Sequence, residues 1–168
     1  LEKGGDNMKK FAIISAIVLV GSATAFAAGS LNVPWFVDNA PDNIDAAQPV
    51  GSVQGFIALH NNTATAIEAT IVYKGNDGAD RTPAGVTSFS IPGDSTVAFR
   101  PVASGEAPAN SESALAATIP NIEAGKSNGS ATISWSTGTA TDIQGRYQEV
   151  VKGLQGSSIG MYLLPAGL

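Results

Sequence analysis

The chain has 168 residues, of which 43% are hydrophobic and 14% are charged, and its formal net charge at pH 7 is -5. The apolar share excludes a wholly disordered chain, and the lack of a basic surplus argues against binding to nucleic acid. Cysteine is absent, which excludes thiol catalysis, disulfides and thiolate-bound metals, so a packed core or partner subunits must hold the fold together.

The first segment has the pattern of an export signal. Residues 8–27 join a short basic start to an apolar stretch and end in an A-x-A cleavage site at 25–27. A retained membrane anchor is the alternative, but small and polar residues thin the stretch, so we predict cleavage after Ala27 and no stable transmembrane span afterwards. Residues 1–7 precede Met8 and can be encoded by a bacterial ribosome-binding sequence, which makes them a mis-assigned leader and indicates a prokaryotic source.

Residues 28–50 form an apolar arm followed by an acidic linker that contains proline. The apolar residues of the arm are Leu31, Val33, Trp35, Phe36 and Val37. We favour the interpretation that the arm is the first strand of its own domain, because most first strands pair within their domain. The sharper alternative is an assembly arm that adds to the sheet edge of another copy and builds a filament or sheath.

From residue 51 onward, apolar and polar residues alternate in short segments separated by turn residues, which is typical of β-strands. The expected strands are residues 52–60, 66–74, 86–91, 95–101, 130–136, 142–151 and 157–164. The clearest alternation places Ala131, Ile133 and Trp135 on one face. In the last segment, Tyr162 stands among apolar neighbours, which predicts a strand buried on both faces.

This pattern predicts an all-β domain at residues 51–168, an antiparallel Ig-like or Greek-key β-sandwich of about seven to nine strands, with a barrel as the alternative. The segments 59–63, 67–73, 90–99 and 129–135 resemble generic Ig-like sandwich modules of exported bacterial surface proteins. The resemblance implies a structural or binding unit of a cell surface and carries no catalytic residues.

Candidate catalytic and metal-binding residues are few. His60 is the one histidine, and a Ser-His-acid triad would need it to face a cleft with a serine and a carboxylate. Asp38, like the other carboxylates of the linker, is expected to be solvated. Asp77 and Asp80 could offer oxygen ligands to calcium, but their segment is first of all a hairpin turn, so no cofactor is expected.

Aromatic side chains could bind a ligand. Trp35 and Tyr147 are the candidate members of a sugar-stacking platform, whereas Trp135 is expected in the core. We therefore expect an exported, non-enzymatic structural protein that self-associates through sheet edges and its N-terminal arm, in the periplasm, at the cell surface or outside the cell. Its expected partners are copies of itself or another surface protein. The rivals are a module that binds polysaccharide or another ligand, and a hydrolase built on His60.

Overall fold

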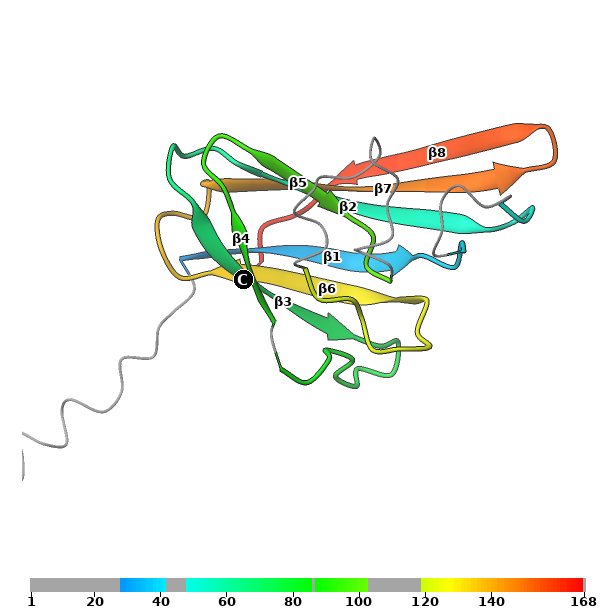
Figure 1. Ribbon diagram of the computed structural model, residues 1–168, viewed down its shortest axis with the longest axis horizontal. Helices are drawn as coiled ribbons and strands as arrows, with labels where there is room; N and C mark the ends of the chain where they lie inside the picture. The colour runs from blue at the N-terminus through cyan, green and yellow to red at the C-terminus, as the bar shows by residue number, and fades with distance from the viewer. Residues whose placement is uncertain (1–27, 42–47, 86, 103–118, 168) are drawn as a thin grey trace, which may run out of the picture.

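The computed structural model describes residues 28–41, 48–85, 87–102 and 119–167 (Figure 1). Its strands are β1 (Gly29–Val37), β2 (Val53–Asn61), β3 (Ile67–Lys74), β4 (Ser88–Ile91), β5 (Thr96–Phe99), β6 (Asn128–Trp135), β7 (Ile143–Gly153) and β8 (Gly156–Leu163). The predicted export signal lies outside the described residues. Within the described ranges, no helix is long and apolar enough to cross a membrane.

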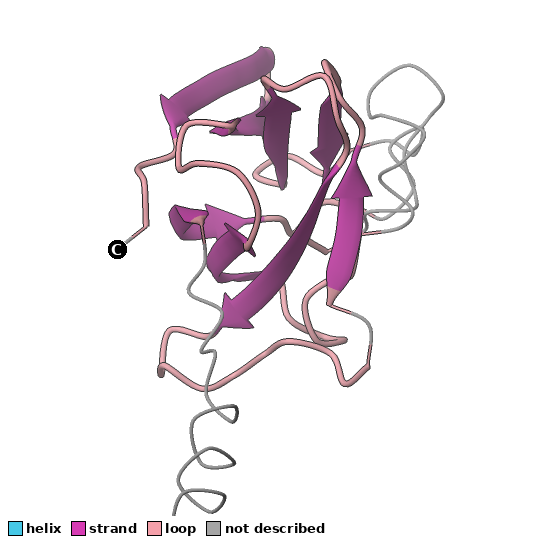
Figure 2. Ribbon diagram, turned by 90° about the vertical axis from the view of Figure 1, so that its left-hand side faces the viewer, coloured by secondary structure: helices cyan, strands magenta, loops and turns pink. Residues whose placement is uncertain are grey.

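The eight strands form two four-stranded antiparallel sheets packed as a sandwich, which confirms the predicted fold class. One sheet has the order β1-β6-β3-β4 and the other β5-β2-β7-β8 (Figure 1). Figure 2 shows the strands after a turn of 90°. Along the chain, β3 is followed by its neighbour β4 and β7 by its neighbour β8. The segment described above as an arm is β1, and it pairs with β6 of the same chain, with Gly29 opposite Trp135.

The core lies between the sheets and uses the inward positions that alternation predicts. Its largest fully buried aliphatic side chains are those of Ile57, Leu59, Ile71, Ile91, Ile133 and Ile143, and Trp135 and Phe99 are buried with them. Each such side chain contributes about 1.5–3 kcal/mol when it leaves water. A core of this kind stabilises the domain without covalent cross-links.

Two connections, β2 to β3 and β4 to β5, cross between the sheets and meet at Asn61. The Asn61 side-chain nitrogen donates to the carbonyls of Thr65 at 2.8 Å and Ile91 at 3.0 Å, and its oxygen accepts from the Thr63 N–H at 2.9 Å. This buried side chain therefore satisfies backbone groups in the β2–β3 connection and at the last residue of β4. It joins the layers at one end of the sandwich.

The prediction that the last strand is buried on both faces is wrong. All residues of β8 are exposed, and the exposed fractions are 64% for Ile159, 61% for Met161 and 82% for Leu163. The strand stands at the border of its sheet, and the β7–β8 hairpin reaches past the ends of β1 and β6 in the opposite layer (Figure 1). An apolar segment in the sequence does not reveal whether another layer covers it.

Candidate functional site

The first candidate site is the outer edge of β8. The strand pairs with β7 along its whole length, and just beyond it the Leu164 N–H donates to the Gly145 carbonyl at 2.9 Å. Hydrogen bonds alternate along an antiparallel ladder, so the even-numbered residues of β8 bond to β7. The backbone groups that point away from β7 belong to Ser157, Ile159, Met161 and Leu163.

This edge lacks the usual protection against pairing with another chain. Natural edge strands carry charged residues, proline or a bulge, or lie under another segment. Strand β8 contains no charged residue and no proline, and its register with β7 is continuous. Among the described residues, none pairs with its outer side.

The other sheet borders are shorter or covered. Strands β4 and β5 have 4 residues each. The edge of β1 lies under the C-terminal segment, where the Asn32 N–H donates to the Pro165 carbonyl at 3.0 Å and the Gly167 N–H donates to the Ser30 carbonyl at 2.8 Å. Of the described strands, β8 thus presents the long uncovered edge.

The second candidate site begins at a bulge in β1. The register with β6 shifts between Val33 and Phe36, and both of these side chains are fully buried. Strict alternation from Val33 would turn Trp35 inward, but the extra residue turns it to the surface. The bulge therefore exposes a tryptophan that the core would otherwise contain.

Trp35 borders a hollow of about 430 Å³ between the bulge and the β7–β8 hairpin. The hollow is lined by Pro34, Trp35, Tyr147, Glu149, Gly160, Met161 and Tyr162. The Tyr162 hydroxyl donates to the Trp35 carbonyl at 2.8 Å, which joins β8 to the bulge. The exposed fractions of Trp35 and Tyr162 are 43% and 37%, so both rings can contact a ligand.

Tyr147, the other member of the predicted platform, lies deeper. Its exposed fraction is 2%, and its hydroxyl accepts from the Val37 N–H at 3.0 Å and donates to the Val37 carbonyl at 3.1 Å. Burial raises the pKa of this tyrosine above its ordinary value, so it stays neutral. Tyr147 packs against the Tyr162 ring at a centroid distance of 5.3 Å, and Tyr162 offers the accessible face in its place.

Glu149 and Gly160 lie opposite each other in the β7–β8 ladder, and both line the hollow. A Cβ atom at Gly160 would lie 3.3 Å from Cγ of Glu149, so the glutamate side chain passes over the glycine. In the part of the chain that the structure describes, no ion pair involves Glu149. The hollow therefore combines aromatic faces with one carboxylate.

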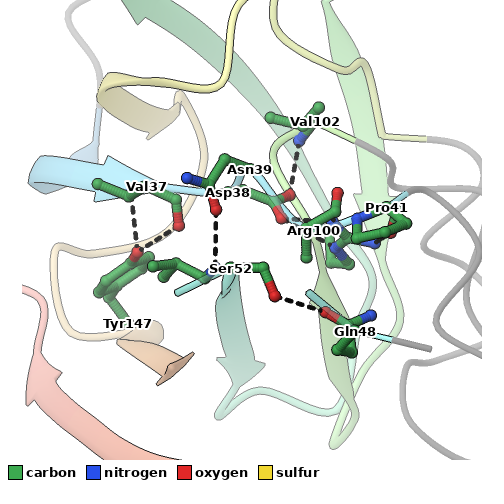
Figure 3. Close-up of polar contacts among 11 residues, drawn as sticks. Val37, Asp38, Asn39, Pro41, Gln48, Ser52, Arg100, Val102 and Tyr147 are labelled. Atoms are coloured by element: carbon green, nitrogen blue, oxygen red, sulfur yellow. Dashed lines mark hydrogen bonds and ion pairs between the residues drawn. The ribbon is translucent and has the colours of Figure 1, made fainter. Parts of the chain in front are cut away.

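The expectation that Asp38 is a solvated linker carboxylate is wrong. Asp38 and Arg100 are both 0% exposed, and the guanidinium donates to Oδ1 of Asp38 from Nη2 at 2.5 Å and from Nε at 3.1 Å (Figure 3). The Val102 N–H donates to Oδ2 at 3.2 Å, and Arg100 also donates to the Pro41 carbonyl at 2.9 Å. Burial raises the pKa of Asp38, while the bonds and charge of Arg100 act in the opposite direction.

This ion pair fastens the end of β1 to the end of β5 in the other sheet. The other carboxylates of the linker, in residues 42–47, lie outside the described residues. Because both charged groups are saturated with internal partners, the pair is a structural element of the fold.

His60 lies at the end of β2 beside Thr96, with 3.0 Å between Nδ1 and Oγ1. Both residues line an open hollow of about 330 Å³ together with Gln144, Arg146 and neighbouring residues. The described lining includes neither a serine nor a carboxylate. The three residue types of a hydrolytic triad are thus not brought together there.

Asp77 and Asp80 lie in the turn after β3, and each is bound to a cation of the chain itself. Asp77 accepts from Arg81 at 2.9 Å, and Asp80 accepts from Lys74 at 3.0 Å. Bonds from the Thr82 backbone and side chain, helped by Lys74, lower the pKa of Asp80 to about 2. Among the described residues, no three histidine, aspartate or glutamate side chains are grouped to hold a metal.

Sequence reasoning missed Glu149 and Gly160 as neighbours of Trp35, and it assigned Tyr162 to a buried strand and not to the aromatic platform. Glu149 and Gly160 are joined by hairpin pairing, which a two-residue turn at Leu154 predicts in principle. The position of Glu149 and Gly160 near Trp35 depends on the bulge in β1, and no local sequence pattern predicts that bulge.

No family model matches the chain, and no curated protein matches its sequence. Among solved structures, the chain is similar to the crystal structure of Thermotoga maritima 1070, with a TM-score of 0.51 and 9% sequence identity. The similarity covers 83% of this chain and 94% of the Thermotoga maritima chain. At this identity the likeness extends to the β-sandwich fold alone.

Proposed function

We propose that this chain is an exported, non-enzymatic structural protein of a prokaryotic cell surface, and that it assembles with further copies through the outer edge of β8. The observation that supports this function is an eight-residue edge strand without charge, proline or bulge. A second copy of the same edge is a self-complementary partner, because neither copy carries a charge that would repel the other.

Two β8 strands can pair in antiparallel orientation about a two-fold axis at Gly160. This register places the outward backbone groups of Ile159 opposite those of Met161 in the other copy, so the free donors and acceptors meet. Opposed side chains then share one face of a sheet that continues through both molecules. The glycine at the axis allows the backbones to approach closely.

The apolar side chains make this pairing favourable. Each Ile, Met or Leu that leaves water contributes about 1.5–3 kcal/mol when it is fully buried. Because the contact is two-fold symmetric, each of these residues contributes once from each copy. Association costs at least about 4 kcal/mol in lost rigid-body freedom. Partial burial of Ile159, Met161 and Leu163 from both copies acts against that cost, together with the new backbone hydrogen bonds between the strands.

The test is analytical ultracentrifugation of residues 28–168 over a wide concentration range, with Ile159→Lys as the edge variant. Lysine at this position replaces an apolar contact with a charge in both copies, so we expect the association constant to fall about 100-fold, from about 1.5 kcal/mol of lost burial in each copy. The β7–β8 bonds remain, because the backbone groups of residue 159 point outward.

Val50→Lys is the matched control, since Val50 is also an exposed apolar residue and lies outside β8. This variant should associate like the parent protein. A parent protein that stays monomeric at all concentrations, or an Ile159→Lys variant that associates as well as Val50→Lys, would overturn the proposal.

A ligand-binding module is the second candidate function, and the hollow beside Trp35 favours it. An exposed tryptophan turned outward by a bulge is a common feature of binding surfaces. A variant that loses ligand binding but still assembles, or a variant that loses assembly but still binds the ligand, separates the two functions.

A further inference from the structure

We propose that the hollow between the β1 bulge and the β7–β8 hairpin binds a small organic ammonium ion, with Glu149 as the counter-charge and Trp35 and Tyr162 as the aromatic faces. This binding site shares Gly160 and Met161 with the β8 strand that the proposed function uses, but its aromatic faces and its carboxylate do not belong to the outer backbone edge of that strand.

The aromatic contribution comes from two different sheets. Trp35 stands on the bulge of β1, and Tyr162 reaches from β8 to bond the Trp35 carbonyl at 2.8 Å. That bond fixes the two elements relative to each other before a ligand arrives. Aromatic faces attract cations through their quadrupole, and tryptophan does so most strongly.

The charge comes from Glu149, which is half-buried and has no ion-pair partner among the described residues. Gly160, opposite it in the ladder, has no side chain, and the Glu149 side chain lies in the space that a side chain there would fill. The basic residues nearest in sequence on β7, Arg146 and Lys152, alternate to the other face of the strand. A cation in the hollow would therefore meet an uncompensated carboxylate.

The polar side chains favour a cation over a sugar. The hydroxyl protons of Tyr147 and Tyr162 are donated to the carbonyls of Val37 and Trp35, and Glu149 only accepts. Apart from the indole N–H of Trp35, the lining side chains thus offer acceptors. A sugar needs both donors and acceptors for its hydroxyl groups, whereas an ammonium ion needs only negative charge and aromatic surface.

The experiment is an isothermal titration of residues 28–168 with choline and with 3,3-dimethyl-1-butanol, its neutral isostere, at low ionic strength. We expect choline to bind at least 10-fold more tightly than the alcohol, because the two differ only in charge. Glu149→Gln should remove that preference, and Trp35→Leu should weaken choline binding at least 10-fold.

Glu68→Gln is the matched control, because Glu68 is an exposed glutamate on β3. It should leave choline binding unchanged, and thermal melting should show that all variants are folded. Absence of choline binding, equal binding of the two ligands, or a Glu149→Gln variant that keeps the preference would overturn the inference. Ile159→Lys should bind choline normally, so a failure here is distinguishable from a failure of β8 assembly.

Discussion

Replacing Asp38 by asparagine tests the claim that a buried ion pair joins the two sheets. The substitution preserves shape but removes the charge, and it leaves the Arg100 guanidinium 0% exposed without its counter-ion. Removing one partner of a buried pair costs about 3–5 kcal/mol. Since domains of this size have about 5–15 kcal/mol of stability, the variant should lose a large share of it. The expected fall in Tm is about 10–20 °C.

Urea unfolding of residues 28–168, followed by tryptophan fluorescence, measures this loss, because the buried Trp135 becomes exposed on unfolding. Asp94→Asn is the control, because Asp94 is exposed and asparagine accepts its positive φ of 51°; it should change stability by less than about 0.5 kcal/mol. In the double variant Asp38→Leu with Arg100→Met, no charge remains buried. Its loss of stability should therefore be about 1–3 kcal/mol smaller than the sum of the losses measured for Asp38→Leu alone and Arg100→Met alone. A loss below about 1 kcal/mol for Asp38→Asn, or strictly additive losses, would refute the reasoning.

Three further predictions concern the rest of the sandwich. Asn61→Ala leaves buried carbonyls without donors, so chemical denaturation should show a loss of about 2–4 kcal/mol, whereas Asn62→Ala, at an exposed site, should lose less than about 1 kcal/mol. Gly55→Ala places a Cβ atom 2.5 Å from the Val37 carbonyl oxygen, so thermal unfolding should show a loss of about 1–3 kcal/mol; an unchanged Tm would contradict this packing. The pKa of Asp80 is lowered from 3.8 to about 2, which means that the folded state binds this proton less readily than the unfolded state; stability should fall as the pH drops through that window, and Asp80→Asn should flatten that part of the pH profile.

The fold was predictable because its strands carry a local signal. In β6, and in β3 apart from Val72, apolar and polar residues alternate, so Ile71 and Ile133 had to face a core whatever their partners were. The number of strands followed from the turn residues between them. The partners themselves did not follow, because β1 pairs with β6 and β2 with β7 across long stretches of sequence.

The candidate sites were predictable only in part. Trp35 was selected because aromatic side chains with a polar edge favour interfaces, but its outward orientation depends on a bulge that has no sequence signature here. Asp38 lies between a strand and a polar linker in the sequence. Its partner Arg100 is 62 residues further along the chain, so the local sequence does not predict the ion pair. Tyr162 had apolar neighbours on both sides, and such a segment suits a covered strand and an associating edge equally well.

The pairing of β1 with β6 sets an order of events during synthesis. The strand that leaves the ribosome first finds its neighbour only after roughly a hundred more residues have been made. At about 5–20 residues per second, the nascent polypeptide spends several seconds without a partner for its leading strand. During that interval the sheet that contains β1 and β6 cannot close, so the sandwich is completed late in synthesis.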